Sequence, residues 1–424
     1  IHAATMVTAG VYMVGRNAVL FSHAPMVMTI VAIIGVLTAL MAASIGLVQY
    51  DIKRVLAYST VSQLGYMFTA MGVGAFSAGA FHLMTHAFFK ALLFLGSGSV
   101  IHAMGGEQDM RRMGGLKKYM PVTFATMFIG TLAIAGVPPL AGFFSKDEIL
   151  YNAFLHNKTV WVLAVITAMM TAFYMFRLVA MTFFGAYRGP AWEKRDHDVG
   201  HGPAEPHGGH HAAHGAHGVR GGGAPGVNDA HGHGPWHGPH ESPSAMTFPL
   251  MALAVGAIVA GFIGIPAALG GGNAIERFLE PSFTAEEVRL KPDTTSGGTE
   301  TAAGTATNNE NVRSVRLQPD QAQDETEHEA SRGVELGLMG VSVLIAAIGI
   351  GLAWRFYITS PETSERLAER FAGAHRLLSR KYYVDELYDA TVIAATWESA
   401  RGLWTVDQTV VDGAVNGAGR LTVI

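Results

Sequence analysis

The sequence contains no cysteine and is poor in charged residues. Only 15% of its 424 residues are Asp, Glu, Lys or Arg, whereas soluble domains carry about 25%. Without thiolates, the chain itself cannot form disulfides, thiolate metal sites or cysteine-ligated iron–sulfur clusters. Half of the residues are hydrophobic, and the mean hydropathy is +0.27. This composition is typical of a membrane subunit without a redox centre of its own.

Signals for bound nucleotides and cofactors are also missing. The sequence has no G-x-x-x-x-G-K-[ST] motif, no dinucleotide-binding fingerprint and no haem or flavin signal. ATP is therefore not expected to drive the chain's function. The energy would have to come from an ion gradient or from partner subunits, and we expect no cofactor and no metal in this chain.

Eight apolar segments are long enough, or nearly so, to cross a bilayer as helices, which takes ~20 residues. They predict an all-α fold, a polytopic membrane helical bundle. The chain starts inside the first of these segments without Met and stops inside an amphipathic run, so we expect a fragment that lacks both natural ends. The approximate ranges are 1–16 (truncated), 26–50, 54–74, 78–103, 121–155, 159–184, 246–270 and 333–358.

The fifth segment contains Gly136-Val-Pro-Pro139. Proline lacks a backbone donor and clashes with the preceding helical turn, so we expect a discontinuous helix broken near 136–142. At membrane depth such breaks are tolerated only beside protein or a wet cavity.

The short connections between the apolar segments form two alternating sets, one rich and one poor in Lys and Arg. The positive-inside rule places the basic set in the cytoplasm. Eight crossings would start and end on that side. The alternate set holds only Arg16 and Lys158. The basic set holds Lys53, Arg54, Arg111, Arg112, Lys117, Lys118, Arg188, Lys194, Arg195 and Arg355.

Two polar insertions interrupt the apolar pattern. The loop 188–245 is rich in His and Gly, with 11 of the 19 histidines between 197 and 240. This composition predicts a disordered cytoplasmic loop, and metal buffering by its histidines is the alternative interpretation. The stretch 271–332 contains 6 Lys and Arg residues and 12 Asp and Glu residues. This composition predicts an acidic, disordered insertion on the outer face.

The C-terminal part differs from the spans before it. A connector, 359–384, leads into an amphipathic stretch, 385–424, in which Trp397 and Trp404 fall on one side and charged residues on the other. This pattern predicts a helix that lies along the membrane surface or along partner helices. The remaining predicted units are a transmembrane core, 1–187, and two transmembrane helices, 246–270 and 333–358.

The fourth span carries three costly polar residues, His82, His86 and Lys90, spaced by four. This spacing places the three on one helical face. A lysine in the middle of a span costs ~2.5–3.5 kcal/mol on insertion scales and usually handles ions or protons. Neutral imidazole suits a proton relay because one nitrogen accepts while the other donates. The alternatives are a lysine that reaches the interface, histidines that only bond between helices, and a His-x3-His metal site.

Four further residues are candidates for the same relay. Lys146 and Asp147 follow the proline break, where a carboxylate could exchange protons with water. Their alternative is an ordinary helix start with Ser145 as N-cap. Lys53 either marks a charged helix boundary or reaches inward. His2 either joins the relay or makes one packing hydrogen bond.

These residues, in this order, resemble the antiporter-like L subunit of bacterial NADH–quinone oxidoreductase (respiratory complex I), and the first four matching segments also resemble the M and N subunits and Mrp-type sodium/proton antiporters. The fifth, with the amphipathic stretch after it, points to the L type. The matching segments are Ile1-His-Ala-Ala-Thr-Met-Val7, Asp51-Ile-Lys-Arg-Val-Leu-Ala-Tyr-Ser59, His82-Leu-Met-Thr-His-Ala-Phe-Phe-Lys90, Gly142-Phe-Phe-Ser-Lys-Asp-Glu148 and Lys381-Tyr-Tyr-Val-Asp-Glu-Leu-Tyr388.

The resemblance implies a proton-translocating, multi-pass subunit of the bacterial inner membrane, and an Mrp-type sodium/proton antiporter subunit is the alternative. It implies that NADH, FMN, iron–sulfur clusters and quinone reside in partner subunits. The M, N and small membrane subunits would contact the stretch from about 385 as a lateral helix, and nucleic acid is not an expected partner. The implied polar axis carries its middle proton at Lys90 and ends near Lys146 and Asp147. Its members are His2, Lys53, His82, His86, Lys90, Lys146 and Asp147.

Overall fold

The computed structural model describes residues 6–191, 236, 238–283 and 321–422, with only the backbone described for 321–331. These residues are helical, and within them the one β contact is an isolated bridge between Asp51 and Asp109. The α-helices are α1 Ala9–Arg16, α2 Ala18–Ser22, α3 Pro25–Gly46, α4 Ile52–Gly72, α5 Phe76–Ala103, α6 Pro121–Ala135, α7 Ala141–His156, α8 Lys158–Phe183, α9 Ser244–Val259, α10 Ala274–Leu279, α11 Gln321–Trp354, α12 Glu362–Arg370, α13 Ala372–Ser379, α14 Val384–Tyr388, α15 Ala394–Val406 and α16 Asp412–Thr422.

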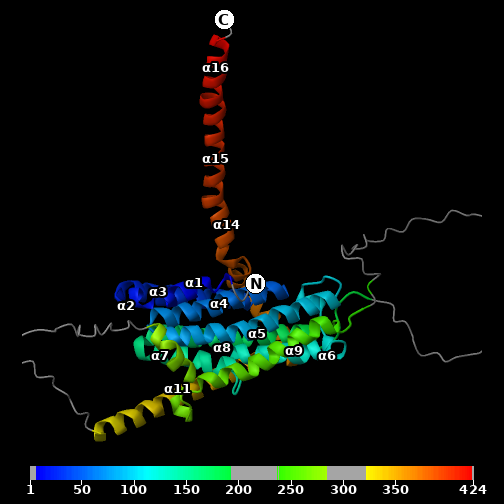
Figure 1. Ribbon diagram of the computed structural model, residues 1–424. Helices are drawn as coiled ribbons and strands as arrows, with labels where there is room; N and C mark the ends of the chain where they lie inside the picture. The colour runs from blue at the N-terminus through cyan, green and yellow to red at the C-terminus, as the bar shows by residue number, and fades with distance from the viewer. Residues whose placement is uncertain (1–5, 192–235, 237, 284–320, 423–424) are drawn as a thin grey trace, which may run out of the picture.

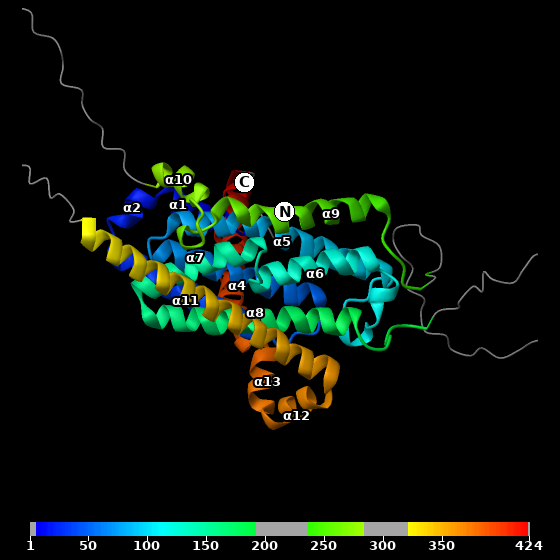
Figure 2. The same ribbon diagram turned by 90° about the horizontal axis from the view of Figure 1, so that it is seen from below.

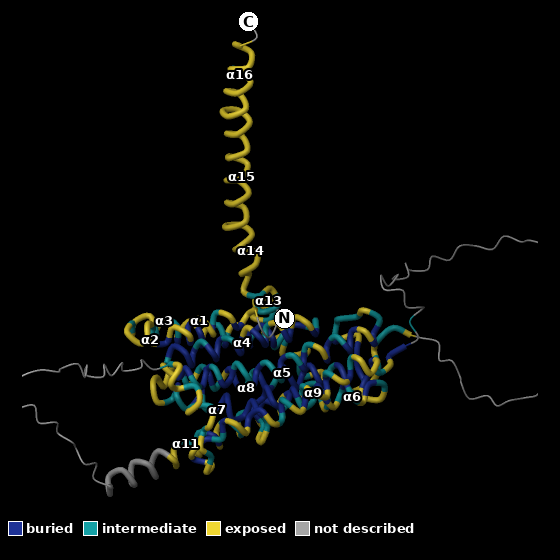
Figure 3. Tube along the Cα trace, viewed as in Figure 1, coloured by how far each residue is buried: buried dark blue, intermediate teal, exposed yellow. Residues whose placement is uncertain are grey.

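The long helices form one bundle, with α5 in its interior (Figures 1 and 2). Five helical stretches in the described residues are long and apolar enough to cross a membrane: Pro25–Gly46, Phe76–Ala103, Lys158–Phe183, Ser244–Gly264 and Arg332–Thr359. The all-α, polytopic membrane fold expected from the sequence is therefore confirmed at this level. The tube in Figure 3 is most continuously buried along α5 and its neighbours.

Helices α3 and α4 approach closely because their contact surface is built from small residues. A Cβ added to Gly65 would lie 2.5 Å from the backbone nitrogen of Ala39, and one added to Gly72 would lie 2.2 Å from that of Ala32. Such small-residue surfaces let membrane helices pack backbone to backbone. This contact fixes α4 against α3 and leaves the opposite face of α4 for α5.

A break separates α6 from α7, at the place where the sequence predicted it. Helix α6 ends at Ala135, Gly136 follows in the left-handed conformation with φ 82°, and α7 starts at Ala141. The first turn of α7 lies directly against the end of α6, since a Cβ on Gly142 would come within 2.0 Å of the carbonyl oxygen of Ala133. The break therefore brings a helix end and a helix start into the bundle interior.

The basic connections meet at one end of the bundle. The Ile52 amide donates to the Gln108 carbonyl at 3.0 Å, and the Gly115 amide donates to the Phe184 carbonyl at 3.1 Å. The guanidinium of Arg188 also donates to the carbonyl of Arg111 at 3.1 Å. Three connections far apart in the sequence are thus held together as one basic surface.

The described residues of the predicted acidic insertion, 271–332, include helices where the sequence predicted disorder. Residues 271–283 are placed, and they include α10 and the turn Glu280–Ser282. The Phe283 ring lies 5.9 Å from the Phe76 ring, so this stretch docks on α5 where composition alone suggested disorder. Helix α11 starts at Gln321, earlier than predicted. Residues 284–320, and most of the His-rich loop (192–235 and 237), lie outside the described residues.

The C-terminal helices leave the bundle at a sharp turn. Lys381, Tyr382 and Tyr383 all have φ between 54° and 59°, a conformation that non-glycine residues rarely adopt. The Tyr382 hydroxyl lies 2.8 Å from the Ser44 hydroxyl of α3, which anchors the turn. The Asp385 carboxylate accepts a hydrogen bond from Lys381 and so raises the pKa of that ammonium. Beyond this turn, α14–α16 extend across the direction of the bundle helices and are exposed along their length (Figures 1 and 3).

Candidate functional site

The candidate site lies on α5, at the centre of the bundle. The side chains of His82, His86 and Lys90 are each 0% exposed, so their predicted position on one buried helical face agrees with the structure. The centroids of the two imidazole rings are 6.4 Å apart. Lys90 therefore does not reach a polar interface, and the alternative in which it did so is not what the structure shows.

His82 is hydrogen-bonded through both ring nitrogens. Its Nε2 lies 3.0 Å from Oε1 of Gln63 on α4, and its Nδ1 lies 2.9 Å from Oγ of Ser145 on α7. A carbonyl oxygen can only accept, so this arrangement makes Nε2 the donor and Nδ1 the acceptor in the neutral ring. The Thr85 hydroxyl, 2.8 Å from Ser145 Oγ, extends the chain. Three helices thus meet at one imidazole.

His86 and Lys90 have different surroundings. Both ring nitrogens of His86 and the Nζ of Lys90 are buried without a hydrogen-bond partner in the described protein. Aromatic rings lie close to both residues. The Phe89 ring is 5.4 Å from the His86 ring, and the Phe94 ring is 5.6 Å from Lys90 Nζ. Buried polar groups rarely stay unpaired. Water is the natural partner for these three nitrogens.

The broken helix supplies the second group of polar side chains. Lys146 is 3% exposed, and its Nζ donates to the carbonyl oxygen of Ile134 at 2.7 Å. That carbonyl belongs to the last turn of α6, where carbonyls lack helical partners and cations are favoured. The ring of Tyr66 lies 5.5 Å from the same ammonium. The break therefore provides a carbonyl acceptor for the buried ammonium of Lys146.

Asp147 and Glu148 follow on α7 and line a cavity of about 200 Å³. Asp147 is 6% exposed. Ser145 is not the N-cap of this helix, because α7 starts at Ala141 and Leu140 occupies the cap position. The alternative of an ordinary helix start at Ser145 is therefore wrong. The Ser145 hydroxyl contacts both His82 and the Ala141 carbonyl of its own helix, which lies 3.2 Å away.

One predicted member of the axis, Lys53, is not part of this buried group. Lys53 is exposed near the start of α4, where its backbone amide donates to the Asp51 carboxylate at 2.8 Å. His2 lies outside the described residues. The structure thus brings together His82, His86, Lys90, Lys146 and Asp147 in one bundle interior, but not Lys53.

Several buried polar residues were not identified from the sequence. Gln63 and Thr85 contact the His82 network, and both are 0% exposed. Arg177, 1% exposed, donates from Nη1 to the Gln49 carbonyl at 2.6 Å, and its guanidinium lies 4.9 Å from the Tyr50 ring. Lone polar residues inside apolar spans were the available signal, but they do not say which neighbour each one meets. In the described residues, no three His, Cys, Asp or Glu side chains converge as a metal site would require.

The chain is similar to subunits of NADH- and NAD(P)H-quinone oxidoreductases. Residues 1–171 match the family model described as NADH:quinone oxidoreductase/Mrp antiporter, TM. The NAD(P)H-quinone oxidoreductase chain 5 of Picosynechococcus sp. is 42% identical over 100% of this chain and 55% of its own length. The NADH-quinone oxidoreductase subunit L of Rhodobacter capsulatus is 39% identical over 98% of this chain and 57% of its own length. The chain thus spans little more than half the length of these relatives.

A solved structure of an Mrp complex from Dietzia sp. contains a chain with 20% identity and a TM-score of 0.48, matched over 67% of this chain and 54% of that one.

Proposed function

We propose that the chain is an antiporter-like membrane subunit of an NAD(P)H–quinone oxidoreductase and that it translocates protons in the membrane arm of such a complex. Its similarity to the L and chain 5 subunits of these oxidoreductases supports the proposal. The redox reaction would take place in other subunits, which would hold NADH, FMN, iron–sulfur clusters and quinone. The chain's own task would be to accept, hold and release protons. The chain itself would carry no redox cofactor.

One observation carries this proposal: a fully buried lysine, with no hydrogen-bond partner in the described part of the chain, follows two buried histidines on a single helix. A lysine in a low-dielectric interior can give up its proton, and a change in nearby charge then decides whether it holds one. Structural lysines are usually paired or exposed, and Lys90 is neither. Holding a proton only part of the time is the role that this environment suits.

The proposed relay runs along α5 and then to α7. A proton held at Lys90 passes through water to His86, and from there to His82, which is bonded to Ser145. Imidazole and hydroxyl groups can each accept one proton while donating another. The residue after Ser145 is Lys146, and Asp147 follows it at the cavity described above. Lys53, exposed on α4, would act at the inner mouth of the path, and His2 would be a further member.

The arrangement of the chain in the membrane is part of the proposal. The basic surface formed by the connections around 50–54, 104–120 and 184–188 would face the cytoplasm of a bacterial cell, and eight crossings would follow from the apolar segments. Helices α14–α16 would lie in the membrane plane as a lateral helix against neighbouring M- and N-type subunits. Their exposed apolar residues, such as Trp397 and Trp404 at 65% and 64% exposure, would be covered there.

The experiment that tests the relay uses the full-length subunit in its assembled complex. Lys90→Ala and Lys90→Arg are compared in membrane vesicles, with proton uptake measured against NADH oxidation. Both variants should lower the protons moved per NADH, because alanine carries no proton and arginine does not release one. Lys158→Ala is the matched control, since Lys158 is exposed at the start of α8. Normal pumping by both Lys90 variants would show that Lys90 is not a proton carrier.

An Mrp-type sodium/proton antiporter subunit is the alternative, because the matching family model covers both classes and ends at residue 171. The relatives that match the entire chain are quinone oxidoreductase subunits, which favours the first proposal. Sodium efflux without quinone reduction in vesicles that contain the native complex would favour the antiporter.

A further inference from the structure

A small cavity beside α7 is lined by four carboxylates and by no basic side chain among its described residues. The cavity has a volume of about 200 Å³ and lies between α7, the segment 266–276 and α11. Asp147 and Glu148 come from α7, Glu276 from α10 and Glu335 from α11. Carboxylates gathered in this way repel one another unless protons or cations neutralise them. The cavity therefore needs positive charge.

A single amide holds two of these carboxylates together. The Nδ2 of Asn273 donates to Glu148 Oε1 at 3.2 Å and to Glu276 Oε2 at 2.6 Å. Asn273 has φ 38°, a left-handed conformation that asparagine tolerates better than most residues. The loop that carries Asn273 thus fixes Glu276 opposite α7.

Three oxygens at this cavity have no partner. Oδ2 of Asp147, Oε2 of Glu148 and Oδ1 of Asn273 are buried and accept no hydrogen bond from the described protein. Asp147 is more than nine-tenths buried and lines the cavity. All three atoms are acceptors when the acids are ionised, so what they lack is a donor or a cation.

We infer that this cavity is a binding site for a monovalent cation, either a proton carried on the carboxylates and water or a sodium ion. The inference rests on the proposed function, in which Asp147 ends the relay, and it assigns Glu148, Asn273 and Glu276 to the step that follows. The described residues offer no cluster of three carboxylate or imidazole side chains at metal-binding spacing. A bound cation would therefore keep part of its water, and about 200 Å³ accommodates several molecules.

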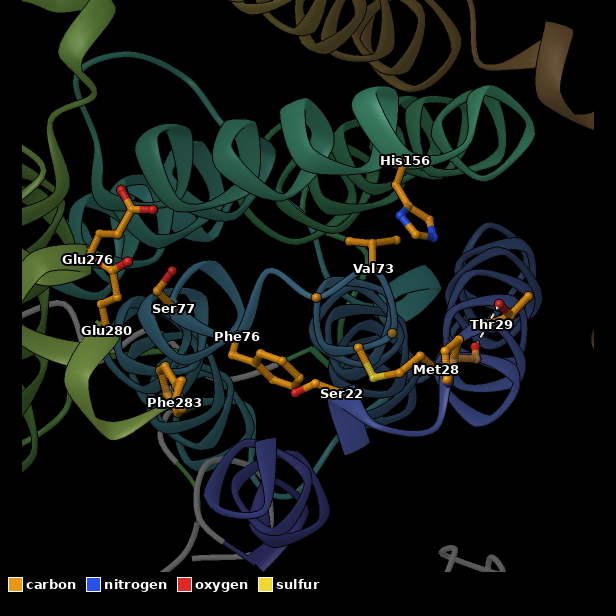
Figure 4. Close-up of a pocket in the computed structure, with 13 residues that line it drawn as sticks. Ser22, Met28, Thr29, Val73, Phe76, Ser77, His156, Glu276, Glu280 and Phe283 are labelled. Atoms are coloured by element: carbon orange, nitrogen blue, oxygen red, sulfur yellow. Dashed lines mark hydrogen bonds between the residues drawn. The ribbon is translucent and has the colours of Figure 1, made fainter. Parts of the chain in front are cut away.

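Glu276 also connects this site to an open groove. It lines a second cavity of about 540 Å³, formed by the ends of α3, α4 and α5 together with Glu280 and His156. Figure 4 shows the side chains of Glu276, Glu280 and Ser77 gathered at one edge of this groove, with His156 at the other end. A cation released from Glu148 thus has an acidic residue on its way into the groove.

The test labels the carboxylates directly and needs no turnover. The assembled complex, purified in detergent, is treated with dicyclohexylcarbodiimide, which reacts with protonated carboxyl groups in apolar surroundings. Modified peptides that contain Asp147 and Glu148 are quantified by mass spectrometry over a range of pH. Each pH is examined in sodium chloride and in choline chloride at equal ionic strength. The facing groups that set the pH dependence are Glu276, Glu335 and the neighbouring Lys146.

Two variants make the test specific. Asn273→Gly keeps the left-handed backbone but removes the amide, so the pH of half-maximal labelling should move up by about one unit as the ionised carboxylates lose a donor. Asn152→Ala is the matched control. Asn152 lines the same cavity, but its amide donates to the backbone carbonyl of Glu148 within α7.

Labelling that rises as pH falls, and that shifts in Asn273→Gly but not in Asn152→Ala, supports the site. Stronger suppression by sodium than by choline then identifies sodium as a ligand, and equal suppression identifies the proton alone. Labelling that is absent at every pH, or that is the same in both variants, overturns the inference. A Lys90→Ala complex should label normally, so failure of the relay and failure of this site can be told apart.

Discussion

The two histidines of α5 lie one helical turn apart and have opposite surroundings. His82 is bonded through both nitrogens to Gln63 and Ser145, whereas neither nitrogen of His86 has a hydrogen-bond partner among the residues that the structure describes. Both are fully buried, so burial does not explain the difference. The contacts from α4 and α7 explain it, because they reach His82 and not His86. The site therefore has two parts. Hydrogen bonds to other helices fix the geometry of His82, whereas His86 and Lys90 would take their hydrogen bonds from water.

This difference has a consequence for stability as well as for transport. A polar group whose partner is removed in the interior costs ~1–3 kcal/mol, whereas removing a group that had no partner leaves nothing stranded. The His82 half should therefore respond to substitution in both stability and pumping. The half formed by His86 and Lys90 should respond mainly in pumping.

The largest expected effect is at Lys90. We expect Lys90→Met to abolish the proton translocation that depends on this subunit, yet to leave the subunit as stable as before or more stable. Methionine fills similar space, and replacing a buried charge with a well-packed apolar side chain is often stabilising by ~1–4 kcal/mol. The measurements are proton uptake in vesicles and the thermal denaturation of the purified complex. A lower denaturation temperature in the Lys90→Met complex would contradict this prediction, because it would mean that Lys90 stabilises the bundle.

The next effect compares the two histidines directly. His82→Leu should destabilise the subunit by roughly 1–3 kcal/mol, because it leaves the buried Gln63 carbonyl without its hydrogen-bond donor and removes one contact of the Ser145 hydroxyl. His86→Leu should change stability by less than about 1 kcal/mol, because no protein group loses a partner. Both should reduce pumping. Thermal denaturation of the two complexes decides the point, and equal destabilisation would remove the distinction between the two halves.

A smaller effect is expected at Ser145. Ser145→Ala should cost about 1–2 kcal/mol and slow pumping several-fold, because His82 loses its contact with α7. Ser97→Ala is the matched control, since the Ser97 hydroxyl is equally buried but donates to the Phe94 carbonyl of its own helix, at 2.7 Å. Pumping rates of the two variants in vesicles test this. If both slow to the same extent, the hydroxyl at 145 has no special part in the relay.

The smallest effect is expected at the basic end of the bundle. The Asp109 carboxylate accepts hydrogen bonds from Arg111, which lowers the pKa of Asp109 below its ordinary value. This stabilisation is present above the pKa of the unfolded chain, ~4, and is lost as pH falls through the lower pKa of the folded state. Asp109→Asn should cost less than about 1 kcal/mol, because the pair is largely exposed. Denaturation at neutral and acid pH would show whether the difference between variant and parent disappears in acid.

Much of the site could be predicted because membrane burial makes polar residues conspicuous. His82, His86 and Lys90 stood out in an apolar segment, and their spacing predicted a common face. The break near Gly136 followed from the two prolines. Residues 271–283 were different, since their composition indicated disorder while Phe283 and Asn273 dock onto Phe76 and Glu148.

The sequence by itself determined which residues are costly to bury and how often they recur along a helix. Composition, periodicity and proline chemistry act within one segment, and they suffice to place Lys90 inside the bundle and to break α6 from α7. Only the tertiary structure decided which buried groups are paired, because hydrogen bonds reach about 3 Å and depend on how separate helices pack. That packing gave His82 two partners and His86 none, left Lys53 exposed, and brought Asn273 to the carboxylates of α7 and α10.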